Sequence, residues 1–163
     1  MTAETRLPDP VLRLLDGRSL ADKVGETFLL LASESTMWPR VAMLSAGEVL
    51  APSPAEIRLA LYPNSGTTHA LTASGKGLLH VVAAPAAYRI RIGVRPVGAA
   101  AGPDGGDGIS LAYFTGSVLG VDVDQVGYAT ITSGITYTLS QQGDVVRRWE
   151  RQVERLRSLR AGS

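Results

Sequence analysis

The sequence predicts a mainly β protein, built as an antiparallel split β-barrel of six to seven strands. Short apolar runs of strand length follow one another closely, turn-forming residues separate them, and helical periodicity is confined to the chain ends and one short internal segment. The 163 residues, 45% of them hydrophobic, suffice for one core. We therefore expect a single domain over 1–163, with helices in 1–24, a barrel in 27–140 and a helix in 143–160.

The N-terminal segment predicts two short helices. Pro10 suits the first turn of a helix over 8–15, and Gly17 ends it. Ser19 is a candidate N-cap for a second helix over 19–24.

Three strands are predicted next, over 27–33, 40–51 and 56–62. Prolines in the links 35–40 and 52–55 favour antiparallel hairpins.

A short helix over 67–74 follows the third strand, and Gly75 closes it. Two more strands are expected over 78–84 and 87–97, before a Gly-rich loop over 98–108.

The last strands are predicted over 110–124 and 128–140, the second rich in Thr and Ile. An amphipathic helix over 143–160 ends the chain, with Asp144 as the expected N-cap. Its stripe toward the barrel comprises Val145, Trp149, Val153, Leu156 and Arg160.

Charge and composition exclude several classes of function. The formal net charge is only +1, and Glu interleaves with Arg in the last helix, so no nucleic-acid partner is expected. The chain has no cysteine, which removes thiolate nucleophiles and cysteine metal sites. No apolar run approaches the roughly 20 residues that cross a bilayer, and no signal-peptide core is seen. We expect a cytoplasmic protein with no membrane partner.

The sequence offers no familiar catalytic constellation. His69 and His80 are the only histidines, and the hydrolase, zinc-protease, P-loop and dinucleotide motifs are missing. Catalytic residues therefore stay unassigned and no metal site is predicted. We interpret His80, among aliphatic strand residues, as a core or interface histidine.

The polar turn in "LYPNSGTTHAL" (61–71) is the strongest candidate for a binding site. The free N–H groups of 66–68, at the start of the predicted helix, point toward the end of the preceding strand, and such groups bind anions. Ser65, Thr67 and Thr68 add hydroxyl groups. An ordinary helix cap explains the same residues and is favoured when the turn is considered alone.

The order of "WPRVAMLSAGEVLA" (38–51), "LALYPNSGTTHAL" (59–71), "GLLHVV" (77–82) and "AYRIRI" (87–92) resembles the pyridoxamine 5'-phosphate oxidase-like family, the FMN-binding split barrels. The resemblance extends roughly from Val24 to Leu139. It implies a homodimer with FMN at the interface.

Carried over, the resemblance assigns each part of the flavin to residues of this chain. The ring and ribityl chain fall to Arg40, Val41, Ala42, Met43 and Leu44, with N–H groups up to Ser45, and are flanked by Leu61 and Tyr62. The phosphate falls to Ser65, Thr67 and Thr68. Trp38 and the segment 131–137 are further candidates to approach the flavin.

Two departures from the family matter. The phosphate turn lacks the usual Arg or Lys, leaving Arg40 or His69 to offset the phosphate charge. The chain ends "RLRSLRAGS" rather than in the Arg-Leu-x-Pro segment of true pyridoxamine 5'-phosphate oxidases, so vitamin B6 oxidation is not expected.

Three hypotheses remain open. The first is an FMN-dependent oxidoreductase acting on a small molecule, with NAD(P)H as a candidate electron donor; a flavin brings its own redox chemistry, which suits the missing catalytic motifs. The second is a non-catalytic flavin-binding or structural dimer. The third is the same fold with F420 or haem, where His80 or His69 would ligate the iron.

Overall fold

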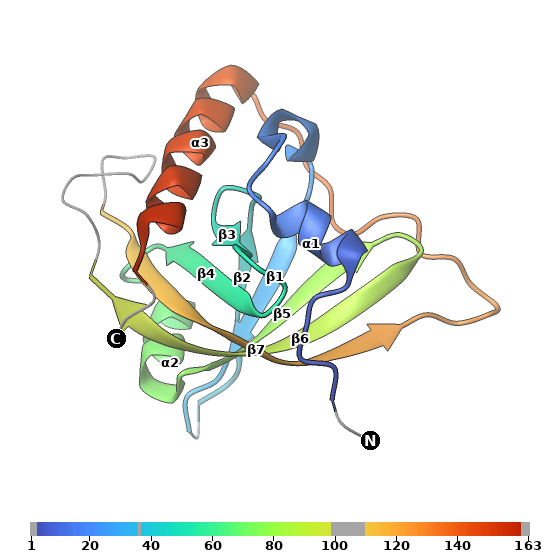
Figure 1. Cartoon of the computed structure of the whole chain (residues 1–163), viewed down its shortest axis with the longest axis horizontal. Coiled ribbons are helices and arrows are strands. Elements are labelled where there is room, and N and C mark those ends of the chain that lie inside the picture. The colour runs from blue at the N-terminus through green and yellow to red at the C-terminus, as the bar shows by residue number, and fades with distance from the viewer. Residues whose placement is uncertain (1–2, 36, 99–109, 161–163) are drawn as a thin grey trace.

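A curled antiparallel sheet of seven strands forms the body of the computed structural model, which describes residues 3–35, 37–98 and 110–160 (Figure 1). The strand order is β2-β1-β5-β6-β7-β4-β3, and all neighbouring pairs run antiparallel. The strands are β1 (Phe28–Ala32), β2 (Arg40–Leu44), β3 (Val49–Leu50), β4 (Glu56–Leu61), β5 (Lys76–Ala83), β6 (Ala86–Val97) and β7 (Ala112–Asp124). This confirms the predicted mainly β split barrel. Most of the expected loop over 98–108 lies outside the described residues.

The segment 40–51, predicted as one strand, is two strands at opposite edges of the sheet. Ser45 and Glu48 close a turn between β2 and β3, in which the Glu48 N–H donates to the Ser45 carbonyl (3.1 Å). Only the four residues of this turn join the two edges. Because four residues span about 14 Å at most, the sheet must curl until its edges approach each other. The prediction of a single strand was wrong, because Ser45, Gly47 and Glu48 interrupt the apolar run and form the turn.

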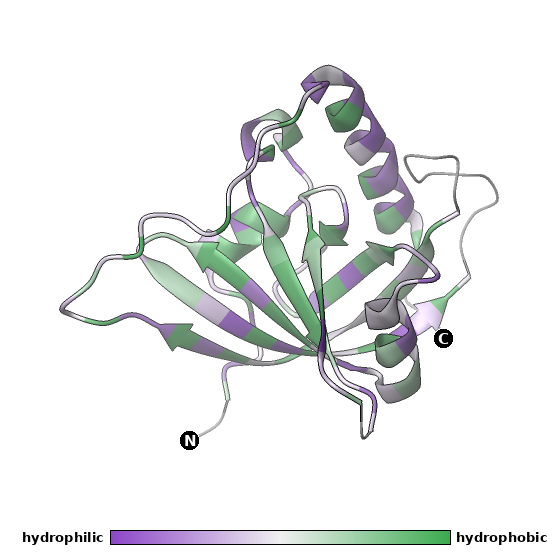
Figure 2. Ribbon diagram, turned by 180° about the vertical axis from the view of Figure 1, so that it is seen from behind, coloured by the Kyte–Doolittle hydropathy of each residue, from purple (hydrophilic) through white to green (hydrophobic). Residues whose placement is uncertain are grey.

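The concave side of the curled sheet carries the hydrophobic core. Hydrophobic residues recur along the strands (Figure 2), and their buried side chains pack into one cluster. The largest fully buried side chains in the described residues include Phe28, Leu30, Leu79, Ile90 and Phe114. Burial of these side chains is the main term that stabilises the barrel.

Helices cover both ends of the barrel (Figure 1). The predicted N-terminal pair is present as α1 (Asp9–Leu15) and the 3-10 helix η1 (Leu20–Lys23), and α2 (Gly66–Ser74) follows β4. The last helix, α3 (Gln142–Ser158), packs against β3, β4 and η1, whereas α2 packs against β1, β2 and β6.

Helix α3 is anchored to the turn between β2 and β3. A Cβ at Gly47 would lie 2.3 Å from the Trp149 ring, so the absence of a side chain there lets the indole seat on the turn. The predicted cap is wrong, because the helix starts earlier: Gln141 is the N-cap, and Asp144 lies in the first turn and pairs with Arg147. Arg160, predicted in the buried stripe, is exposed.

The strand predicted over 128–140 is wrong. Residues 125–141 form neither helix nor strand; they run out beyond the β5–β6 hairpin and return to α3 (Figure 1). The Thr-rich composition favours a strand locally, but β7 already pairs with β6 on one side and β4 on the other, so no adjacent edge is free.

Strand β4 is buried on both faces. Arg58, the charged residue of this strand at its third position, is only 8% exposed. One Arg58 guanidinium nitrogen donates to the carbonyls of Leu156 (2.8 Å) and Arg157 (3.0 Å). A buried arginine thus satisfies the carbonyl end of α3.

No helix among the described residues is long and apolar enough to cross a membrane.

Candidate functional site

Arg40, the first residue of β2, lies against the N-terminus of α2. A Cβ at Gly66 would be 3.2 Å from Arg40 Nε and 3.3 Å from its Cδ. A side chain at position 66 would therefore push the arginine away. Arg40 is exposed and forms no ion pair with any described residue, so its charge is available to a ligand.

A pocket of about 220 Å³ lies at this junction of β2 and α2. It is lined by Glu34, Met37, Trp38, Arg40, Gly66, His69 and Ala70. Both groups predicted to offset the phosphate charge, Arg40 and His69, thus line one pocket. Glu34 brings an opposing charge to the same rim.

The start of α2 adds hydrogen-bond donors to this pocket. In the described part of the chain, the N–H groups of Gly66 and Thr67 make no hydrogen bond, whereas the His69 N–H donates to the Ser65 carbonyl (3.1 Å). The N-terminus of a helix carries a partial positive charge of about half a unit. Together with Arg40, these groups form an arrangement that suits an anion.

The hydroxyl groups of Ser65 and Thr68 are already used within the helix cap. Thr68 Oγ1 donates to the Tyr62 carbonyl (2.7 Å), so in its 2.8 Å contact with Ser65 Oγ the serine must be the donor. Ser65 Oγ in turn accepts the Thr68 N–H (3.1 Å). Neither hydroxyl proton is left for a phosphate, and the two residues serve to hold the turn. Thr67 is buried, and its hydroxyl bonds no described residue.

The outer side of β2 presents apolar side chains. Val41 and Met43 are 57% and 58% exposed. They face Leu31 and Leu29 across the β1 register, and Leu31 is in turn opposite Leu78 on β5. We call these five residues, Leu29, Leu31, Val41, Met43 and Leu78, the outer apolar face. Among the strands that the structure describes, β2 pairs only with β1, so none of them occupies the sheet edge beside this face.

Other predicted flavin contacts point elsewhere or are already bonded. Ala42 and Leu44 alternate with the outer residues and lie toward the core, and Leu61 is buried. Tyr62 is 43% exposed. The Ser45 N–H, predicted to reach the ring, donates instead to Glu48 Oε2 (2.6 Å).

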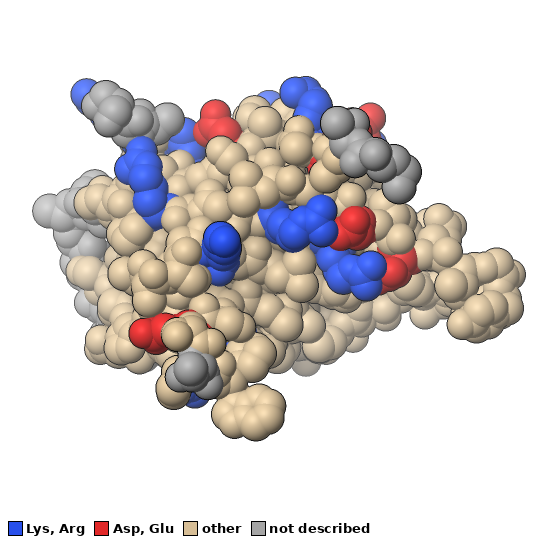
Figure 3. Space-filling model, turned by 90° about the horizontal axis from the view of Figure 1, so that it is seen from below, with Lys and Arg blue, Asp and Glu red and all other residues tan. Residues whose placement is uncertain are grey.

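Charged groups border the outer apolar face on β6 and β7. Arg89 pairs with Asp124 (2.9 Å) and Arg91 with Asp122 (2.6 Å). His80 lies between the two regions, opposite Leu29 on one side and Arg89 on the other, and is half-buried. Seen from below, uncharged atoms cover most of the surface, with charged side chains in a few groups (Figure 3). An uncharged surface with ion pairs at its margin is typical of a protein interface.

The segment 131–137 lies mainly against the N-terminal helices. Thr132, Ser133, Gly134 and Thr136 line a pocket of about 500 Å³ together with residues of α1, η1 and the end of β5. Tyr137 alone turns toward the end of β2, where it lines a separate cavity with Met43, Leu44 and Ser45.

This separate cavity contains groups that sequence reasoning missed. Burial raises the pKa of the Glu48 carboxyl, against the lowering effects of the Ser45 hydrogen bonds and the Arg148 charge. Burial, followed by the charges of Glu48 and Glu26, raises the pKa of the Tyr137 hydroxyl. The residues come from separate segments of the chain, and no motif in the sequence signals that they meet.

The architecture matches solved split barrels. Among them is a candidate pyridoxamine 5'-phosphate oxidase from Lactobacillus delbrueckii, which aligns with a TM-score of 0.54 and 11% identity over 75% of this chain and 99% of that chain. An FMN-binding protein from Syntrophomonas wolfei aligns less well, with a TM-score of 0.45 and 15% identity over 70% of this chain and 88% of its own. The fold is therefore that of the pyridoxamine 5'-phosphate oxidase-like split barrels, which confirms the resemblance seen in the sequence.

A relative is also found by sequence. The uncharacterized protein YclD of Bacillus subtilis (strain 168) is 30% identical over 151 residues, which cover 93% of this chain and 96% of YclD. The chain belongs to the same family as YclD. No family model matches the sequence.

Proposed function

We propose that the protein is an FMN-binding flavoprotein that acts as a single-domain homodimer and catalyses an oxidoreduction of a small molecule. The observation that carries this proposal is the junction of Arg40 with the N-terminus of α2, where one unpaired cation and two unpartnered N–H groups meet. The split-barrel fold and the family resemblance of the sequence supply the flavin as the group to test there.

The phosphate would bind at this junction. A guanidinium and backbone N–H groups are strong donors to phosphate oxygens, and Gly66 leaves room for close approach. Arg40, which precedes the polar turn in the sequence, would thus supply the cation that the turn itself lacks. His69, in the same pocket, is a second donor.

The flavin ring would lie along the outer side of β2. Val41 and Met43 offer exposed apolar contacts beyond Arg40, and β2 has a free edge whose backbone groups can hydrogen-bond a polar ring. When bound, a flavin supplies electron transfer itself. The chain would bind it, orient it and exclude water from it.

A second copy of the chain would cover the outer apolar face. Contiguous exposed apolar side chains mark interaction sites in soluble proteins. A partner seated on Leu29, Leu31 and Val41 would close the flavin between two protomers, and this supports a homodimer with the cofactor near its interface.

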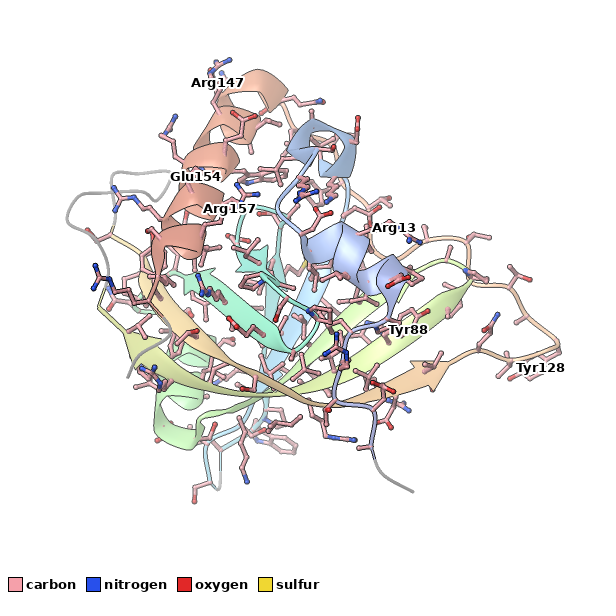
Figure 4. The ribbon with its side chains drawn as sticks, in the orientation of Figure 1. Arg13, Tyr88, Tyr128, Arg147, Glu154 and Arg157 are labelled. Atoms are coloured by element: carbon pink, nitrogen blue, oxygen red, sulfur yellow. The ribbon has the colours of Figure 1, made fainter. Side chains whose placement is uncertain are left out.

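The absorbance spectrum of the protein as purified, followed by titration with FMN and riboflavin, tests the proposal. We expect a flavin spectrum and tighter binding of FMN than of riboflavin. Arg40→Gln should weaken FMN binding about 10-fold or more, since a charge-assisted hydrogen bond is lost, and leave riboflavin binding unchanged. Arg147→Gln is the matched control, because Arg147 lies at the far end of α3 (Figure 4).

Three results would replace the proposal. Binding of F420 but not FMN would assign the site to the deazaflavin. A Soret band would assign it to haem, with His80 or His69 as the axial ligand. A colourless dimer that binds none of these would support a structural role.

A further inference from the structure

A groove of about 700 Å³ crosses the outer side of the sheet over β1, β5, β6 and β7. It is open to solvent and mainly apolar, and the side chains that shape it include Leu31, Pro39, Leu78 and Leu119, with Lys76 and Arg91 as its charged members. Sites for small molecules have volumes of about 300–1,000 Å³ and are lined mostly by apolar groups with a few polar ones. The groove has the size and the lining of such a site.

The floor of the groove is a row of side chains in register across three strands. Leu31 on β1 is opposite Leu78 on β5, and Leu78 is opposite Arg91 on β6. Leu31 and Leu78 are half-buried, so each keeps surface that a ligand can contact. Because both belong to the outer apolar face, the groove continues that face toward β6 and β7.

A β-bulge places Leu119 at the edge of the groove. The pairing of β6 with β7 shifts by one residue between Arg91 and Ile92, which leaves Leu119 without an opposite residue. Bulges re-aim side chains in this way. Leu119 is 51% exposed, and its Cδ1 lies 3.0 Å from the position that a Cβ of Gly93 would occupy. The absence of a side chain at Gly93 therefore lets the leucine lie over β6 as an apolar wall.

Arg91 contributes its aliphatic stem rather than its charge. Its Nη1 donates to Asp122 Oδ2 (2.6 Å) on β7, and its guanidinium covers Gly120, where a Cβ would collide with it. The Arg91 charge is thus directed away from the groove and is already paired.

Lys76 carries the available charge of the groove. It lies two residues before Leu78, on the same side of β5, and is exposed. Its ammonium group makes no hydrogen bond or ion pair with any described residue, because the two bonds to Ser74 involve the Lys76 backbone. An ammonium group only donates, so this end of the groove favours an anionic group.

These features define the chemistry of the occupant. It has an apolar body for the leucines and one anionic group for Lys76. A carboxylate carries the single charge that one ammonium group can balance, whereas a phosphate ester carries close to two at neutral pH. The groove therefore suits a carboxylate better than a phosphate.

We propose that this groove binds a small apolar carboxylic acid, with its carboxylate at Lys76 and its body on Leu31, Leu78 and Leu119. The groove adjoins the proposed ring position, because Leu31 is opposite Leu78 on one side and Val41 on the other. Identifying the acid as the substrate of a flavin reaction rests on the proposed function. Binding of the acid does not.

The test is binding of 2-naphthoate to the full chain, followed by ligand-observed NMR. The alcohol 2-naphthalenemethanol offers the same apolar body without the charge, and acetate offers the charge without the body. We expect the naphthoate to bind about 5-fold more tightly than the alcohol, and acetate not to bind at millimolar concentration. Lys76→Gln should weaken naphthoate binding about 5-fold and leave binding of the alcohol unchanged, since only the acid uses the charge.

Two matched pairs of variants separate the charge from the apolar wall. Arg95→Gln removes an exposed cation of β6 that does not line the groove, so it should leave naphthoate binding unchanged. Leu119→Ser should weaken binding of the acid and the alcohol alike, because both use the wall. Val123→Ser, at an exposed apolar position of the same strand outside the groove, should affect neither.

Three results would each overturn the proposal. They are equal affinity for the acid and the alcohol, equal effects of Lys76→Gln and Arg95→Gln, and no binding of naphthoate at millimolar concentration.

The measurement is made on protein with and without FMN. Binding of FMN without binding of the acid overturns the groove site alone. Binding of the acid in a protein that binds no flavin upholds the groove site and overturns the flavin proposal. Complete displacement of the acid by FMN would place the acid in the flavin site and overturn the groove site.

Discussion

Arg40 Nε lies 3.2 Å from the position that a Cβ of Gly66 would occupy. The contact joins the start of β2 to the first residue of α2, so a strand cation and the donors of a helix N-terminus serve one pocket. The proposed anion site thus draws on two segments, and each can be changed without the other.

Gly66→Ala should weaken FMN binding and leave riboflavin binding intact. The added Cβ displaces the Arg40 guanidinium, while the backbone at position 66 tolerates alanine because its φ is not positive. The free energy of unfolding should stay equal or rise by up to about 1 kcal/mol, since alanine favours helix. Gly98→Ala is the control, with nothing within 4 Å of its Cβ. Equal losses of FMN and riboflavin would show that position 66 does not act through the phosphate.

Thr68→Val should destabilise the fold rather than remove a phosphate ligand. The change breaks the bonds of Thr68 Oγ1 with Ser65 and Tyr62, and loss of such a cap costs about 1–2 kcal/mol. Urea unfolding measures it. Thr72→Val, which removes only the bond to the Thr68 carbonyl, should have a smaller effect. If Thr68→Val is as stable as the native protein but binds FMN more weakly, with riboflavin binding unchanged, the Thr68 hydroxyl is a phosphate ligand.

Arg58→Met should destabilise the protein by about 2–3 kcal/mol. The carbonyls of Leu156 and Arg157 lose a charged donor at the buried end of α3. Chemical unfolding measures the loss. Arg151→Met, a change at an exposed position of α3, is the control. Little difference between the two variants would mean that α3 is held by its apolar face alone.

The stability of the protein should fall as pH rises from the ordinary Glu48 pKa of 4.5 through its raised value in the folded state. The folded protein holds this proton more tightly than the unfolded chain, so stability from this group is fully present below 4.5 and is lost above the raised pKa. The Arg148 charge lowers the pKa of Glu48, and the Glu48 charge in turn raises the pKa of Tyr137.

Glu48→Gln tests this dependence by urea unfolding over a pH series. The variant should lose this decline and be more stable than the native protein at neutral pH. Glu150→Gln, exposed on α3, should keep the decline. An unchanged slope in Glu48→Gln would assign the decline to other groups.

Val41→Lys should shift the protein toward the monomer. The change places a charge on the outer apolar face without touching the core, because Val41 is 57% exposed, and burying an unpaired charge at an interface is costly. Sedimentation velocity measures the shift. The control is Ser158→Lys, at the exposed end of α3, which should sediment as the native protein does. If Val41→Lys remains a dimer, the dimer interface does not include the outer apolar face.

The sequence predicted the elements whose pattern is set locally. β1, β4 and the β5–β6 hairpin were found because short apolar runs end at turn residues, and Gly75 closes α2 in the left-handed conformation as predicted. The division of segment 40–51 was missed although Ser45, Gly47 and Glu48 separate its two apolar runs, because the two runs together read as one long strand. Segment 128–140 has strand composition, but composition does not reveal whether a partner strand is free.

The candidate site was predicted in outline. The place of the polar turn and the need for Arg40 or His69 followed from the residues and from the family resemblance. The use of the Ser65 and Thr68 hydroxyls inside the cap depends on side-chain geometry that spacing does not determine. The meeting of Glu48 with Tyr137 and Arg148 depends on how α3 seats on Gly47.

The two edges of the sheet differ in a way that affects handling of the protein. β3 has two residues, too few to template pairing, whereas β2 offers five residues with exposed Val41 and Met43 beside its unpaired backbone. An exposed apolar edge strand recruits other chains into non-native sheets. The proposed flavin and second copy, by covering β2, would therefore also protect the protein from aggregation, and protein freed of flavin should precipitate more readily than the complex.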